Sequence, residues 1–149
     1  MWSYDFLLPH PQQKTLATQI CRLDSLALTD ENREAVRTQV EECDEDYFIV
    51  THGTDTMWRT AHHCEETAKS LNKTVVFCGA MMPTSFSKTD AKFNVGFATA
   101  VLQCKGVGCH VVMGGLVFSR PLRIYKDLER CVYYEGEQVR RSCAQVRSI

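Results

Sequence analysis

Three short apolar runs recur along this chain, and a helical pattern of apolar residues lies between each pair. The runs occupy 47–50, 74–78 and 109–113, so that their starts are separated by 27 and 35 residues. A strand, a helix and a strand at this spacing favour parallel pairing with right-handed crossovers. The pattern predicts an α/β fold, a three-layer sandwich with a mostly parallel sheet, in which the ends of the three runs meet at one edge.

Helical spacing predicts three helices around these runs. Thr29 is a suitable N-cap for the first; the second starts near Asp55 or Thr56 and stops at Asn72. Gly114-Gly115 predicts a turn. We expect these residues to face the core: Val36, Val40 and Cys43 in the first helix; Met57, Ala61, Cys64, Ala68 and Leu71 in the second; and Phe93, Phe97, Ala100 and Val101 in the third.

Composition limits the classes of partner. The chain of 149 residues carries 17 basic and 18 acidic side chains, a formal charge of -1, which gives neither a basic face for nucleic acid nor a polybasic anchor for lipid. No apolar stretch approaches the roughly 20 residues that span a bilayer, and residues 1–11 lack a signal-peptide pattern. We therefore expect one cytoplasmic domain over 1–149, with 138–149 as a loose tail, that acts on a small molecule without a membrane or nucleic-acid partner.

The eight cysteines do not predict a disulfide or metal framework. None forms a Cys-x-x-Cys pair, and they are scattered through segments apolar enough to form a core, so we expect mostly reduced thiols. His62-His63-Cys64 is the nearest approach to a ligand cluster. Neighbouring positions on a helix point about 100° apart, which prevents joint chelation of one ion. We expect neither a metal nor an organic cofactor.

The stretch 47–57 carries the chemistry, because an apolar run gives way to a glycine, hydroxyls and a carboxylate just before a helix. Thr54 and Asp55 would project from the end of the strand, beside the unpaired N–H groups of the helix start. A hydroxyl nucleophile next to such donors is the arrangement that acyl transfer requires. The same two residues are also ordinary helix caps, and His52 is more simply a hydrogen-bonded core imidazole than a catalyst.

Three stretches of the chain resemble the bacterial-type L-asparaginase family, in particular its short, single-domain members. Thr51-His52-Gly53-Thr54-Asp55-Thr56-Met57 is similar to the second signature of that family at every position. The stretch from Gly79 to Asn94 is similar to a loop and helix start of the family, and the stretch from Asp24 to Asp30 to its substrate-binding serine segment. The resemblance covers residues 22–133.

This resemblance implies a site and a reaction. The catalytic group would be Thr54, Asp55 and a lysine, which falls on Lys126 or is replaced by Tyr125, because the stretch Val117–Lys126 is one residue longer than the family's spacing. The substrate-binding residues would be Ser25, Gly53, Thr54, Asp55 and Ala80. Ser25 and Asp55 would bind the α-carboxylate and α-amino groups of the substrate, and the Ala80 carbonyl would accept a hydrogen bond from its amide nitrogen. It implies hydrolysis of asparagine to aspartate and ammonia through a threonine nucleophile, and permits a homo-oligomer. Lys126 beside Asp127 is equally compatible with a solvated charge pair.

One family segment has no counterpart in this chain. The Thr-Gly-Gly-Thr segment that follows the family's first strand, and supplies another threonine, is missing, so we expect the first strand to be absent and one edge of the sheet to be open. The N-terminal segment or another chain would fill the gap, unless the sequence begins downstream of the true start. Two hypotheses follow: an asparaginase-type amidohydrolase, or an inactive relative that binds an amino acid or a partner subunit.

Overall fold

The structure is a computed structural model that describes residues 17–82, 85–119, 124–127 and 132–135, the last two ranges by their backbone alone. A four-stranded sheet in the order β1-β2-β3-β4 forms its centre, and a separate pair of antiparallel strands, β5 and β6, follows. The elements in chain order are η2 Ser25–Ala27, α1 Asp30–Glu42, β1 Tyr47–Thr51, α2 Met57–Ser70, β2 Thr74–Cys78, α3 Ala91–Cys104, β3 Gly108–Met113, β4 Leu116–Phe118, β5 Ile124–Asp127 and β6 Val132–Glu135.

The first three strands are parallel and in simple register. Tyr47 of β1 lies opposite Thr74 of β2, which in turn lies opposite Gly108 of β3. All side chains of β2 and β3 are buried, as expected for strands covered on both faces. The predicted parallel sheet is therefore confirmed, and the carboxyl ends of these strands share one edge.

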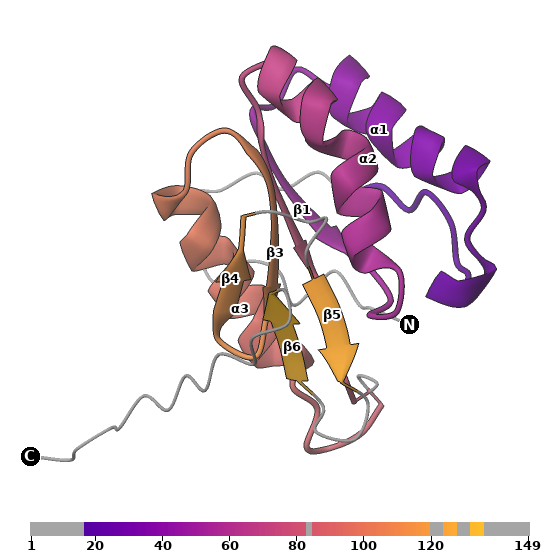
Figure 1. The fold of residues 1–149 in the computed structure, drawn as a ribbon, viewed down its shortest axis with the longest axis vertical. Coiled ribbons are helices and arrows are strands. Elements are labelled where there is room, and N and C mark those ends of the chain that lie inside the picture. Colours follow the sequence, from indigo (N-terminus) through magenta and orange to yellow (C-terminus); the bar gives the residue numbers. More distant parts are fainter. Residues whose placement is uncertain (1–16, 83–84, 120–123, 128–131, 136–149) are drawn as a thin grey trace, which may run out of the picture.

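Helices cover both faces of this sheet, which gives the predicted three layers (Figure 1). One core lies under α1 and α2 and includes Val40, Met57 and Phe77. The second core lies under α3 and includes Val76 and Val95. Opposite faces of β2 thus contribute to different cores, since successive side chains along a strand point to opposite sides.

The first two helices begin and end close to the predicted points. The Thr29 hydroxyl accepts the Asn32 N–H of α1, and α2 ends before Asn72, whose φ of 58° is the left-handed conformation that often follows a helix. The predicted inward face of α2 is buried as far as Ala68, but the expectation for Leu71 is wrong. Leu71 is 41% exposed because it is already the C-cap, where the helical periodicity no longer applies.

The predicted inward face of α3 is wrong at two of its four positions. Val101 is buried and Phe97 is partly buried, but Phe93 is 59% exposed and Ala100 is exposed. The helix is rotated from the expected position because a polar residue, Asn94, occupies the centre of its buried face. The residues that do face the core are Ala91, Asn94, Val95, Ala98 and Val101.

Two features at the sheet margins complete the architecture. Gly114 and Gly115 both have positive φ, 56° and 79°, and form the predicted turn, which joins β3 to the antiparallel β4. At the other margin, β1 pairs with β2 alone among the described residues, and its side chains are exposed or half-buried. Among the residues that the structure describes, the sheet therefore has an open edge at β1, whereas the absence of a first strand stays a prediction. That the chain forms a single domain over its whole length stays a prediction.

Candidate active site

Ser25 of η2 lies against the turn that joins β1 to α2. Its hydroxyl accepts the Asp55 N–H at 3.3 Å and lies 3.5 Å from the Asp55 carboxylate oxygen Oδ2. The Thr56 hydroxyl donates to the Ser25 carbonyl at 2.6 Å, and Ser25 itself is 3% exposed. Two predicted site residues that are 30 positions apart are thus in direct contact.

Gly53 permits this contact because a side chain at its position would occupy the same space as Ser25. A Cβ on Gly53 would lie 2.6 Å from the Ser25 Cβ and 2.8 Å from its Oγ. The glycine is therefore required by a close approach between two segments. Thr56 is the N-cap of α2, but its side chain makes no cap hydrogen bond, because the hydroxyl binds Ser25 instead.

The segment after β2 approaches the same turn from the other side. A Cβ on Gly79 would lie 2.5 Å from the His52 carbonyl oxygen and 3.0 Å from the Thr54 Cγ2. The His52 N–H donates to the Cys78 carbonyl at 2.9 Å, which extends the β1–β2 pairing into the turn. Thr54, 8% exposed, is consequently close to the start of the segment that carries Ala80.

His52 supports the turn through two hydrogen bonds. Its Nδ1 is 2.7 Å from the Gly53 carbonyl oxygen and its Nε2 is 2.8 Å from the Thr60 hydroxyl. Because a carbonyl only accepts, Nδ1 carries the proton, and in the neutral ring Nε2 accepts from Thr60. Burial lowers the pKa of His52, which favours this neutral form. His52 is buried and hydrogen-bonded, as expected of a core imidazole.

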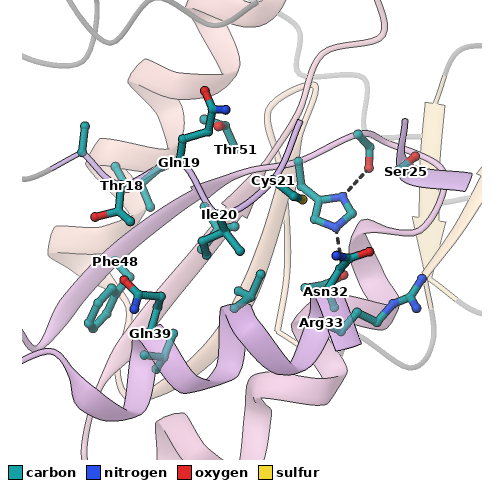
Figure 2. Close-up of a pocket in the computed structure, with 18 of the residues that line it drawn as sticks. Thr18, Gln19, Ile20, Cys21, Ser25, Asn32, Arg33, Gln39, Phe48 and Thr51 are labelled. Carbon is teal, nitrogen blue, oxygen red and sulfur yellow. Dashed lines mark hydrogen bonds between the residues drawn. The ribbon is translucent and has the colours of Figure 1, made fainter. Parts of the chain in front are cut away.

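A cavity of about 1500 Å³ opens beside these residues. Figure 2 shows Thr18–Cys21 alongside the ribbon of β1, with Asn32, Arg33 and Gln39 of α1 nearby. The predicted site residues Ser25, Gly53, Thr54, Asp55 and Ala80 all line this cavity. It exceeds the roughly 300–1000 Å³ typical of small-molecule sites. The cavity extends along β1, since every residue of 47–51 also lines it.

The remaining predicted catalytic residue is Lys126. Its backbone lies in β5, opposite Tyr133 of β6, and its side chain falls outside what the structure describes, as does that of Tyr125. Its role as the lysine of the group stays a prediction.

Three further residues support the site and are not among the predicted site residues: Thr56, Thr60 and Asp90. Thr56 and Thr60 bind Ser25 and His52 as described, and the Asp90 carboxylate accepts the N–H groups of Met81 and Met82. The motif itself contains Thr56, so its hydroxyl could have been considered. No periodic pattern in the sequence indicates the other two.

Within the described part of the chain, no cluster of three or more metal-binding side chains occurs. None of the helices described is long and apolar enough to cross a membrane.

Comparisons with known proteins agree on one family. A family model described as the N-terminal part of asparaginase matches residues 8–126. L-asparaginase 2 of Escherichia coli K12 is 35% identical over 91 residues, 57% of this chain and 26% of the relative. A probable periplasmic L-asparaginase of Haemophilus influenzae is 34% identical over 120 residues, 73% of this chain and 34% of the relative.

A solved structure supports the same relationship. The crystal structure of a probable cytoplasmic L-asparaginase from Campylobacter jejuni superimposes with a TM-score of 0.72 and 28% identity, over 80% of this chain and 39% of that one. The chain therefore spans between 26% and 39% of the length of these three proteins. The Haemophilus influenzae relative is named as periplasmic, and the Campylobacter jejuni protein is named as cytoplasmic.

Proposed function

The chain belongs to the asparaginase family through the N-terminal domain of that family, and from this premise we propose that it hydrolyses the side-chain amide of L-asparagine, or of a related small amide, to aspartate and ammonia. The observation that carries the proposal is the contact between Ser25 and Asp55 at the carboxyl edge of the parallel sheet, beside Thr54 and Ala80. A hydroxyl, a carboxylate and backbone groups meet there around one cavity.

In the proposed reaction the Thr54 Oγ attacks the amide carbon of the substrate. Lys126, uncharged, would take the hydroxyl proton, while Asp55 orients the lysine or the substrate amino group. The tetrahedral intermediate then loses its C–N bond, and ammonia leaves with a proton. Water hydrolyses the resulting ester to release aspartate and restore Thr54. The first N–H groups of α2, which have no intrahelical acceptor, would stabilise the oxyanion, at about 3 kcal/mol per donor.

Substrate recognition would use the residues around the cavity. Ser25 and Asp55 would hold the α-carboxylate and α-amino groups, Gly53 would let the two segments approach, and the Ala80 carbonyl would accept from the amide nitrogen. The cytoplasm is the proposed compartment. Self-association is proposed as well, because β1 pairs only with β2 among the described residues, and a second copy could cover the part of the cavity that β1 lines.

Ammonia release from asparagine and glutamine by the purified chain tests the proposal. Thr54→Ala should abolish the release, and Asp55→Asn should reduce it by orders of magnitude. Thr99→Ala is a matched control, since Thr99 also lines the cavity but lies on α3. An unmodified chain that releases no ammonia yet binds aspartate in calorimetry would instead be the inactive, amino-acid-binding relative. Equal release by the unmodified chain and Thr54→Ala would refute the nucleophile.

A further inference from the structure

Two polar side chains at the start of α3 hold the loop that carries Ala80. The Asp90 carboxylate accepts the Met81 N–H on Oδ2 and the Met82 N–H on Oδ1, both at 3.0 Å. Asp90 is the N-cap residue of α3, yet its side chain makes no cap hydrogen bond. Its carboxylate therefore binds backbone N–H groups of the loop and not those at the start of the helix that it precedes.

Asn94 fixes this carboxylate from one turn further along α3. Its Nδ2 donates to Asp90 Oδ2 at 2.9 Å and to the Gly79 carbonyl at 3.0 Å, and its Oδ1 accepts the Gly114 N–H at 3.0 Å. Asn94 is fully buried; its hydrogen bond to the Gly79 carbonyl is buried as well, and those to Asp90 and Gly114 are partly buried. One amide thus ties together the end of β2, the start of α3 and the turn after β3.

The Met81 N–H and the Ala80 carbonyl belong to the same peptide unit. Because that unit is planar and trans, its N–H and C=O point in opposite directions. An acceptor that fixes the N–H of Met81 consequently fixes the direction of the Ala80 carbonyl oxygen. The turn of the chain just before it is also fixed, since Gly79 is held between Asn94 and the His52 carbonyl.

We infer that Asp90, held in place by Asn94, is a positioning residue that aims the Ala80 carbonyl into the cavity and so sets the preference for an amide over a carboxylate. This inference rests on the proposed function, in which that carbonyl accepts from the substrate amide nitrogen. A carbonyl oxygen attracts the NH₂ group of asparagine and repels the matching oxygen of aspartate. A freely rotating peptide unit would lose this discrimination.

The test introduces Asp90→Ala and Asp90→Asn into the Thr54→Ala chain, which should not consume asparagine, and compares them with Thr54→Ala alone by two measurements. The first is the ratio of asparagine to aspartate affinity in calorimetry, for which Asp90→Ala should lower the preference for asparagine roughly two- to tenfold, the worth of one hydrogen bond. The second is the exchange rate of the Met81 and Met82 amides by NMR, which should rise. Asp90→Asn keeps one acceptor oxygen and should give an intermediate result in both measurements.

Val101→Ala is the matched control for general damage to α3. Val101 is buried on the same helix face but lies about three turns from Asp90, so its truncation should lower stability without faster exchange at Met81 and Met82. Unchanged exchange and an unchanged affinity ratio in Asp90→Ala would overturn the inference. Faster exchange with an unchanged ratio would overturn it as well, because the peptide unit would then not set the preference. If the unmodified chain binds neither amino acid, the proposed function is wrong, and the exchange rates alone decide whether Asp90 holds the loop.

Discussion

Replacing Gly53 by alanine is the sharpest test of how the site is assembled. The new Cβ would lie 2.6 Å from the Ser25 Cβ, about an ångström closer than the separation of about 3.5–4.0 Å at which carbon atoms attract. Gly53 is not among the residues with positive φ, so the penalty comes from the contact and not from the backbone conformation. Ser25 cannot retreat freely, because its carbonyl and hydroxyl are bound to Thr56 and Asp55.

The expected loss of stability is about 1–3 kcal/mol, the usual range for an extra methyl group in a packed site. Urea unfolding followed by circular dichroism measures it as a lower midpoint with an unchanged slope. Gly96→Ala is the matched control: a Cβ there meets nothing within 4 Å, and Gly96 lies inside α3. Removing a glycine from a helix interior should stabilise the chain by about 0.5–1 kcal/mol.

A double substitution separates the steric contact between residues 25 and 53 from other effects of Gly53→Ala on stability. Ser25→Gly removes the two atoms that the new methyl group would meet most closely, and leaves the Ser25 backbone nitrogen 3.3 Å away. Gly53→Ala should therefore cost less in the Ser25→Gly background, by about 0.5–3 kcal/mol of coupling. If the two losses simply add, Ser25 does not lie against Gly53, and the site as described is wrong.

Two pH effects follow from burial. Because burial lowers the pKa of His52, protonation favours the unfolded chain, so stability should be full above pH 6.5 and fall as the pH drops below it. His52→Gln should flatten that part of a urea-midpoint profile, and an unchanged slope would contradict the assignment. Burial raises the pKa of Cys64 and of Cys78 from 9.0 to about 12, so stability should be full below pH 9 and fall between pH 9 and 12, by about 1.4 kcal/mol per thiol at pH 10. Cys78→Ala, compared with Ala substitution of the exposed Cys104, should reduce this alkaline loss; equal profiles for the two variants would contradict it.

The sequence predicted the parallel strands and two of the three helix faces because those elements follow simple apolar periodicities. The face of α3 was not predictable in this way, since Asn94 interrupts the buried stripe and Phe93 lies outside it. The antiparallel β4 was not predicted either. Its three residues are too few to show an alternation, although the glycine turn before it was recognised.

Some residues of the candidate site could likewise be predicted from the order of residues along the chain, and others could not. Local order along the chain indicated Thr54 and Asp55, because a strand end followed by a helix start is visible in the residues themselves. Nothing in the spacing indicated that Ser25 would lie against them, 30 residues away, and only the resemblance to a family pointed to it. Thr60 and Asp90 support the site through hydrogen bonds to His52 and to the loop after β2. Such pairings form only in the folded chain, and apolar periodicity does not indicate them.

Each residue of the motif from His52 to Thr56 contacts a residue outside the motif. His52 is buried and hydrogen-bonded to Thr60, and Thr54 lies against Gly79. The other three residues contact Ser25: Gly53 by close packing, and Asp55 and Thr56 by hydrogen bonds. A contiguous motif is thus specified by contacts from η2, α2 and the end of β2. Residues that would bind substrate and residues that join these segments are largely the same. Loss of activity in any variant of this turn therefore identifies a chemical role only if the unfolding midpoint of that variant is unchanged.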